Sequence, residues 1–223
     1  MSITQNLLSI KETLPEEVRL VAVSKTMPVD ALREAYEAGQ RHFGENKVQE
    51  LTAKQAELPN DICWHLIGHL QTNKVKYIVP FVEYIESVDS LKLLREINKE
   101  ASKVKRTVKC LLQIHIAEEE TKFGLNEEEL TELVQTVLAG HFENVVICGL
   151  MGMATFTEDE KQIRKEFKSL RRIFDKLKSS YFIDKEYFRE LSMGMSGDYQ
   201  IAVEEGSTNV RIGSSIFGVR IYH

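Results

Sequence analysis

Residues 20–28 read LVAVSKTMP. The apolar run at the start of this stretch is unbroken and rich in β-branched residues, which predicts a strand buried on both faces, as in a parallel sheet. Lys25 then falls at the carboxyl end of the strand, just ahead of Pro28. In parallel α/β proteins the loops at that end converge on one crevice or barrel mouth, and active sites lie there. Lys25 is therefore the first candidate site residue.

The chemistry of lysine allows two interpretations of Lys25. A desolvated lysine amine can attack an aldehyde and hold it as a Schiff base, which would make Lys25 a covalent binding residue. Most lysines are exposed, however, so a solvated loop residue or a phosphate-pairing cation is the simpler interpretation. Features elsewhere in the sequence have to decide between these two interpretations.

The composition predicts one globular domain over residues 1–223, with 43% hydrophobic and 28% charged residues and no visible linker. We expect a cytoplasmic protein without membrane contact, because no signal peptide is visible and no apolar run approaches the ~18 residues of a membrane span. A net charge of −5, with basic residues interspersed among acidic ones, gives no general attraction to nucleic acid. The three cysteines form no CxxC pair and the six histidines no HExxH, which argues against a disulfide framework and a zinc site.

The strand-then-helix order of the first unit recurs along the chain. Apolar runs predict seven further strands, at 42–46, 63–68, 84–88, 108–116, 145–152, 189–194 and 209–218. Helical spacing predicts helices between them, and a short helix at 2–13 precedes the first strand. Asp89 is expected to cap one helix, and Asn126 with Glu129 to form a capping box at another. Eight strands alternating with eight helices match the count of an α/β fold, the (β/α)8 TIM barrel, here with an extra N-terminal helix.

Two alternatives to this architecture are open. A doubly wound open sheet has the same alternation, but no GxGxxG follows the first strand, which removes its usual dinucleotide site. Apolar residues spaced 4-3-4-3 in the helix at about 158–180 could mark a coiled-coil seam. The pattern lasts only about two heptads, so we expect an outer helix packed on the sheet.

The ends of the other predicted strands add polar candidates. Asn46 lies at the carboxyl end of the second strand, and His69 follows the third. The loops after strands seven and eight of such barrels often bind phosphate through backbone N–H groups. Small and hydroxyl residues in these two loops would suit that role: Ser192, Ser196 and Gly197 before a helix near Asp198, and Gly213, Ser214 and Ser215. Singly these are common turn residues, but two such turns at this position are harder to dismiss.

A Schiff-base lysine opposite a phosphate site suggests one ligand, an aldehyde that carries a phosphate. Pyridoxal 5′-phosphate (PLP) is the commonest such molecule. Arg211 lies two residues before Gly213 on the same strand face and can point inward beneath the cofactor ring. The alternative for Arg211 is an ion pair inside the barrel with a carboxylate such as Glu45.

Six motifs together resemble a known family: VAVSKTMP, HFGEN, WHLIGHLQTNKVK, TKFG, GLMGM and SMGMSGDYQIAVEEGSTNVRIGSSIFG. From about residue 20 to residue 218 they are similar to the pyridoxal phosphate homeostasis protein family, the YggS-type proteins, and more distantly to the barrel domain of alanine racemase. The resemblance implies a single-domain (β/α)8 barrel in which Lys25 holds PLP as an internal aldimine. It also implies the remaining contacts: Ser196, Gly213 and Ser214 at the phosphate, Arg211 at the pyridine nitrogen and Asn46 near the ring.

Two positions depart from the family pattern. His115 stands where asparagine is expected, and Lys47 follows GEN where an aromatic or bulky residue is usual. The departure at His115 puts a contact from the fifth strand in doubt, whereas neither touches the lysine or the phosphate site.

The resemblance implies a monomeric PLP-binding protein that stores or passes on the cofactor, with PLP-dependent apo-enzymes as candidate recipients and without robust catalysis. A PLP-dependent amino-acid racemase is the alternative, but alanine racemases add a second domain with a tyrosine base, for which this chain of 223 residues leaves no room. A Schiff-base lyase acting on a sugar phosphate without cofactor also fits the lysine. Absorption near the visible would distinguish it, because only the PLP protein would be coloured.

Overall fold

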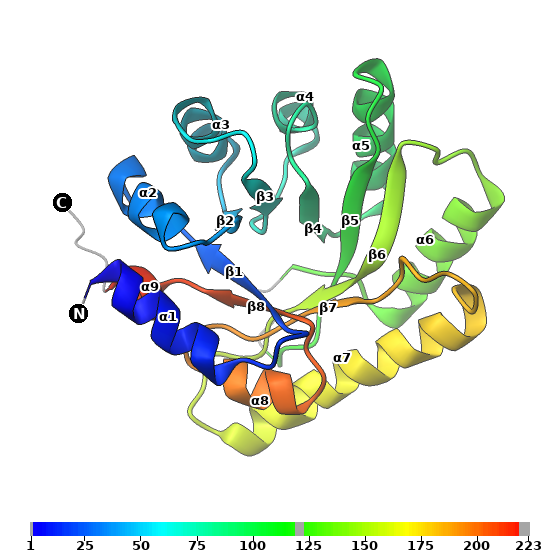
Figure 1. Cartoon of the computed structure of the whole chain (residues 1–223). Helices are drawn as coiled ribbons and strands as arrows, with labels where there is room; N and C mark the ends of the chain where they lie inside the picture. The colour runs from blue at the N-terminus through cyan, green and yellow to red at the C-terminus, as the bar shows by residue number, and fades with distance from the viewer. Residues whose placement is uncertain (1, 119–122, 219–223) are drawn as a thin grey trace.

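The computed structural model describes residues 2–118 and 123–218 (Figure 1). Its eight strands close into a barrel in which each strand pairs in parallel with the next along the chain and β8 pairs with β1. The strands are β1 (Arg19–Val23), β2 (His42–Glu45), β3 (Cys63–Leu66), β4 (Tyr84–Val88), β5 (Val108–Ile114), β6 (Val145–Gly152), β7 (Glu190–Ser192) and β8 (Asn209–Ile212). The predicted (β/α)8 TIM barrel is confirmed, and the open sheet is excluded.

Helices surround the barrel on its outer face (Figure 1). They are α1 (Ile3–Thr13), α2 (Val29–Glu37), α3 (Val48–Glu57), η1 (Thr72–Lys74), α4 (Val75–Ile78), α5 (Leu91–Lys103), α6 (Glu127–Ala139), α7 (Glu160–Tyr181), α8 (Tyr199–Glu204) and α9 (Ser214–Phe217). The extra N-terminal helix, α1, is confirmed and packs beside α2 and α9. No helix within the described ranges has the length and apolar character that crossing a bilayer requires.

The helix starts follow from their capping residues. Asn126 and Glu129 form the predicted capping box of α6. At α5 the prediction was wrong, because Ser90 rather than Asp89 accepts the N–H of Leu93, at 3.3 Å. Asp89 lies one residue too early to cap the helix, and its carboxylate instead lies 3.1 Å from the His69 ring nitrogen.

The core lies between the sheet and the helices. The apolar stripe of α7 is buried against it, as expected of an outer helix: Ile163, Phe167, Leu170, Phe174 and Leu177. β4 and β6 have the predicted bounds, whereas the other six strands end earlier than predicted at their carboxyl ends. They stop at Val23 (β1), Glu45 (β2), Leu66 (β3), Ile114 (β5), Ser192 (β7) and Ile212 (β8), where the chain turns into α9 after Gly213. These ends leave the sheet and become the loops at the barrel mouth. Thr121 and Lys122 of the TKFG motif lie outside the described residues.

Candidate functional site

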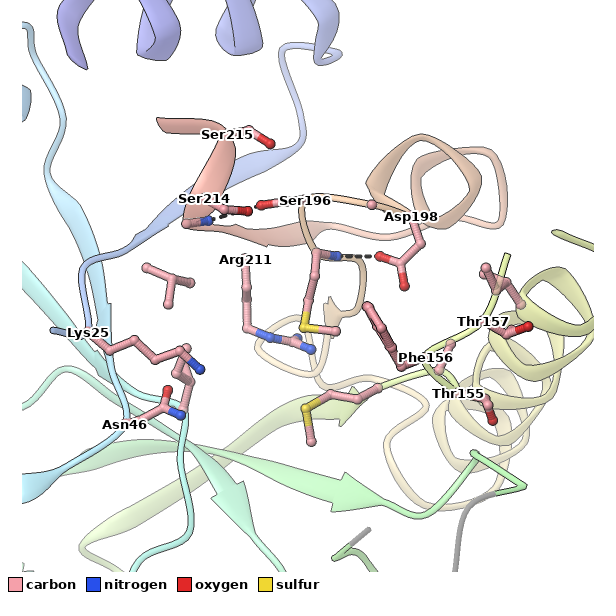
Figure 2. Close-up of a pocket in the computed structure, with 18 residues that line it drawn as sticks. Lys25, Asn46, Thr155, Phe156, Thr157, Ser196, Asp198, Arg211, Ser214 and Ser215 are labelled. Carbon is pink, nitrogen blue, oxygen red and sulfur yellow. Dashed lines mark hydrogen bonds between the residues drawn. The ribbon is translucent and has the colours of Figure 1, made fainter. Parts of the chain in front are cut away.

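A cavity of about 790 Å³ lies at the carboxyl ends of the strands. All six cofactor contacts that the family resemblance implies line it: Lys25, Asn46, Ser196, Arg211, Gly213 and Ser214 (Figure 2). They come from β1, β2, β7 and β8 or the loops that follow them, and closure of the barrel makes these four strands consecutive neighbours. The closed topology is therefore what brings the two ends of the chain to one site.

Lys25 is half-buried two residues beyond the end of β1. Its side chain and that of Asn46, which follows β2, enter the cavity from the same side (Figure 2). The next residue, Thr26, has a left-handed backbone with φ of 66°. This conformation is unusual for a β-branched residue and turns the chain sharply after the lysine.

Ser196 and the Gly213–Ser214 turn lie together on another side of the cavity (Figure 2). The backbone N–H of Gly213 donates to the Ser196 hydroxyl at 3.4 Å. A Cβ added at Gly213 would lie 2.9 Å from the carbonyl oxygen of Val23, so the close approach of β8 to β1 requires glycine here. Hydroxyls and backbone N–H groups around an open space are the donor set that suits a phosphate.

Arg211 reaches the middle of the cavity from β8 (Figure 2). Its residue is only 3% exposed, and burial lowers the pKa of its guanidinium. Nη1 donates to the Ser192 hydroxyl at 2.6 Å and Nη2 to the Gly152 carbonyl at 2.9 Å. Two hydrogen bonds to different strands thus fix the plane of the guanidinium.

The interior carboxylate near Arg211 is Glu86, whose Oε2 lies 3.9 Å from Nη1. The alternative of an ion pair inside the barrel is therefore present, with Glu86 as the partner. Glu45, the carboxylate named as an example, is wrong, because it binds Lys54 of α3 at 2.7 Å. Side chains alternate between the two faces of a strand. Arg211 faces into the barrel, whereas Glu45 faces the surrounding helices.

Ser192 is likewise not part of a phosphate site. It is completely buried, and its hydroxyl donates to Glu86 Oε2 at 2.6 Å while accepting from Arg211. The hydroxyl therefore links the arginine to the carboxylate below the cavity. The prediction of a phosphate contact failed because Ser192 lies on β7 and its hydroxyl is bonded to Glu86 and Arg211 inside the barrel.

Glu86 continues a hydrogen-bonded chain through the barrel interior. Its Oε1 lies 2.6 Å from His65 Nδ1, and His65 Nε2 lies 3.0 Å from His42 Nδ1. Burial alone would raise the pKa of Glu86, but the His65 hydrogen bond and the charges of His65 and Arg211 hold it below its usual range. Burial, with the charges of His65 and Arg19, lowers the pKa of His42 to about 3. These hydrogen-bonded interior residues were not predicted from the sequence. The one signal for them was Glu86, a glutamate inside the apolar strand YIESV.

The loop after β6 also lines the cavity, through Met153 to Thr157. Phe156 is 95% exposed, whereas Thr155 is anchored by Glu166 of α7, which accepts both its N–H and its hydroxyl at 2.7 Å. The GLMGM motif ends at Met153, the first of these residues, so the family pattern did not point to the rest of the loop.

His115 and Lys47, which depart from the family pattern, do not line the cavity, and neither does His69. His115 Nε2 lies 2.9 Å from the Ala117 carbonyl oxygen, and Lys47 is exposed at the start of α3. His69 stacks on Phe123 with ring centroids 4.8 Å apart. In the part of the chain that the structure describes, no group of three or more His, Cys, Asp or Glu side chains could hold a metal ion.

Fold and site define a class of protein: a parallel (β/α)8 barrel whose carboxyl-end cavity brings a lysine and an arginine next to a glycine–serine turn. A family model described as alanine racemase, N-terminal domain, matches residues 1–221. A pyridoxal phosphate homeostasis protein of Aquifex aeolicus is 41% identical over 205 residues, covering 92% of this chain and 88% of that protein. Its counterpart from Homo sapiens is 43% identical over 214 residues, covering 92% and 77%. The chain belongs to the pyridoxal phosphate homeostasis protein family.

Solved structures agree with this assignment. PipY of Synechococcus elongatus PCC7942, solved with PLP bound, is 39% identical, with a TM-score of 0.86 over 97% of this chain and 100% of that one. The same protein without PLP has a TM-score of 0.88 over the same shares. Alanine racemase from Bartonella henselae is 16% identical, with a TM-score of 0.75 over 97% of this chain and 58% of that one, and shows the fold alone.

Proposed function

We propose that this protein binds PLP in the barrel-mouth cavity and acts in PLP homeostasis, storing the cofactor or passing it to PLP-dependent apo-enzymes. The observation that carries the proposal is the convergence on one cavity of six residues from both ends of the chain, at or after four strands. The PLP-bound relative with the same fold supports it. We further propose that the protein acts as a cytoplasmic monomer and that residues 1–223 form one domain.

The chemistry of the cavity fits PLP. The hydroxyls of Ser196 and Ser214, with the turn at Gly213, would receive the phosphate, and the buried Arg211 would donate to the pyridine nitrogen. Asn46 lies next to Lys25, where it would contact the ring (Figure 2). When bound, the cofactor supplies an aldehyde that condenses with amines and a ring that accepts electron density.

Lys25 is the residue that we propose holds the cofactor covalently, as a Schiff base. Its neutral amine adds to the aldehyde carbon and one water leaves, so the step needs no oxidant or reductant. Lys25 is half-buried, and the step requires its amine in the neutral form.

Storage or delivery is favoured over racemisation by what lines the cavity. A racemase needs bases on both faces of its substrate. Apart from Lys25, the described lining residues offer one other base, Asp198, whose Oδ1 already accepts the N–H of Met195, and no tyrosine or histidine. The open mouth, with Phe156 exposed at its rim, suits exchange of the ligand with another protein.

Trapping of the bound cofactor tests this function. The protein incubated with PLP should absorb near the visible, and borohydride reduction should leave the label on Lys25. Lys25→Ala should lose both signals, whereas Lys47→Ala, at an exposed lysine outside the cavity, should keep them. Label found on another lysine, or a wild type that stays colourless with added PLP, would contradict the assignment.

Delivery needs its own measurement. The loaded protein, mixed with an apo-enzyme that requires PLP, should restore that enzyme's activity while its own visible absorption declines. If free PLP released into a trapping reagent accounts for all of the transfer, the protein is a store and not a direct donor.

A further inference from the structure

A buried charged cluster lies behind Lys25, on the outer side of the barrel wall. It consists of Ser24, Glu45, Glu50 and Lys54, and we call it the Lys54 cluster. Lys54 of α3 is 4% exposed, and its ammonium donates to the Ser24 carbonyl, to Glu45 Oε1 and to Glu50 Oε1, each at 2.7 Å. These three bonds use all three protons of the ammonium group.

The cluster forms hydrogen bonds with the residues on both sides of Lys25. Before it, the Ser24 carbonyl accepts from Lys54, and the Ser24 hydroxyl donates to Glu45 at 2.6 Å. After it, the Thr26 N–H donates to Glu50 Oε1 at 2.5 Å. The Lys25 side chain lines the cavity on the opposite side of the wall.

The backbone conformation of Thr26 explains why these hydrogen bonds are needed. Its φ of 66° lies in the left-handed region, which is sparsely populated by β-branched residues and persists only when surrounding contacts enforce it. The bond from Thr26 to Glu50 is the enforcing contact on this residue's N–H, and Lys54 holds Glu50 in place.

The Lys54 cluster contains features that are unfavourable for the stability of the fold. Glu45 is completely buried, burial raises the pKa of its carboxyl group, and its Oε2 has no hydrogen-bond partner among the described residues. Buried ion pairs can often be replaced by apolar side chains without loss of stability. A cluster that leaves a carboxylate oxygen unsatisfied yet fixes both neighbours of Lys25 points to a role in geometry.

We propose that Lys54 is a positioning residue, which through Ser24 and Glu50 sets the backbone of Lys25 and so the rate at which its amine captures an aldehyde phosphate. The inference rests on the proposed function. In the capture step the nitrogen of the neutral Lys25 amine bonds to the aldehyde carbon. The aldehyde oxygen leaves as water, with the two protons of the amine.

Two measurements on Lys54→Met separate positioning from simple loss of structure. Capture of PLP by the apo-protein is followed by visible absorption, and pyridoxine 5′-phosphate, which has an alcohol in place of the aldehyde, measures non-covalent binding. We expect capture to slow by about tenfold or more, because misplacing a reacting group by about 1 Å can reduce rates about 100-fold. Binding of pyridoxine 5′-phosphate should stay within about twofold, because Ser196, Gly213 and Ser214 follow β7 and β8, away from the Lys54 cluster.

The matched control is Lys178→Met. Lys178 of α7 also donates its ammonium to a backbone carbonyl, that of Phe188 at 2.6 Å, but neither residue lines the cavity. Both measurements should match wild type. If Lys54→Met does not fold, Glu50→Ala decides, since its side chain is 23% exposed and it removes the Thr26 anchor. It should slow capture by about threefold or more and leave pyridoxine 5′-phosphate binding unchanged.

An unchanged capture rate in the folded variant would overturn the inference. Equal losses in capture and in pyridoxine 5′-phosphate binding would also overturn it, because they would show a merely structural role. A wild type that binds pyridoxine 5′-phosphate but never captures PLP would overturn the Schiff base on Lys25, and this inference with it. The two failures are therefore distinguishable.

Discussion

At the residue scale, Arg211 determines how much chemistry the cavity supports. An arginine can only donate hydrogen bonds and stays charged, so at the pyridine nitrogen it favours the unprotonated ring and a weak electron sink. We expect alanine racemisation and transamination to be absent or far below the ~10 per second typical of enzymes. Racemisation assays on the loaded protein check this, and rapid turnover by the wild type would support the racemase alternative.

A carboxylate at position 211 should strengthen the electron sink, because it would favour a protonated ring nitrogen. Arg211→Glu alone would place it beside Glu86, and two buried carboxylates so close cannot both ionise. The double variant Glu86→Gln with Arg211→Glu avoids this conflict. We expect it to increase the slow exchange of the α-proton of bound alanine in deuterated water, measured by NMR, if it binds PLP. No increase in a variant that binds PLP would contradict the role of Arg211.

The serines should act on the phosphate alone. Ser196→Ala and Ser214→Ala each remove about one charge-assisted hydrogen bond, worth ~1.5 to 3 kcal/mol, so PLP should bind about tenfold more weakly or worse. The visible spectrum of the bound form should keep its shape. Titration with pyridoxal, which lacks the phosphate, is the control: an equal loss of pyridoxal affinity would show that these serines do not contact the phosphate.

Some of these residues were predictable from the sequence and others were not, for a physical reason. Lys25 and Ser196 follow apolar strands directly, and strand ends are visible in the sequence. Glu86 and Ser192 lie within strands that have no alternation of polar and apolar residues, because a barrel strand is covered on both faces. Their pairing inside the barrel depends on which strands face each other, which the sequence pattern does not contain.

At the element scale, β5 and β6 show where the barrel depends on one glycine. Their register shifts between Cys110 and Leu111, and Gly149 of β6 has φ of 156°. A Cβ added there would lie 1.7 Å from the carbonyl oxygen of Glu190 in β7. We expect Gly149→Ala to destabilise the fold by about 2 kcal/mol or more in urea unfolding.

Gly197→Ala is the control for this substitution, because a Cβ there meets no atom within 4 Å. Its effect should stay within about 0.5 kcal/mol. Equal unfolding free energies for the two variants would mean that β6 and β7 can move apart at little cost. The sequence did not predict the irregular register, since VVICGLMG has the apolar pattern of a regular strand.

Element bounds were predicted correctly for β4 and β6 and least well at the barrel mouth. The segments YIESV and VVICGLMG match β4 and β6. Ser90 and Asp89 are both good capping residues in adjacent positions, and only the backbone conformation of Ser90 selects it.

At the scale of the whole molecule, closure of the barrel assembles the site. Val21 of β1 pairs with Arg211 of β8, so the two ends of the chain share one wall of the cavity. In an open sheet the first and last strands need not meet. The count of eight strand–helix units predicted closure, and with it the meeting of Lys25 with the Gly213 turn.

The barrel as a whole should lose stability in acid through His42. Its pKa falls from 6.5 to about 3 on folding, because burial and the charges of His65 and Arg19 disfavour the protonated ring. Between these values the unfolded chain binds a proton that the folded chain does not. Stability is therefore fully present above about pH 6.5 and falls as the pH decreases, by at most about 1.4 kcal/mol per pH unit from this group.

His42→Gln should remove this slope from urea unfolding measured between about pH 4 and pH 6. His141→Gln, at an exposed position, should keep it. A slope unchanged in His42→Gln would show that acid acts on another group, such as the Glu86 carboxylate that His65 and Arg211 hold ionised.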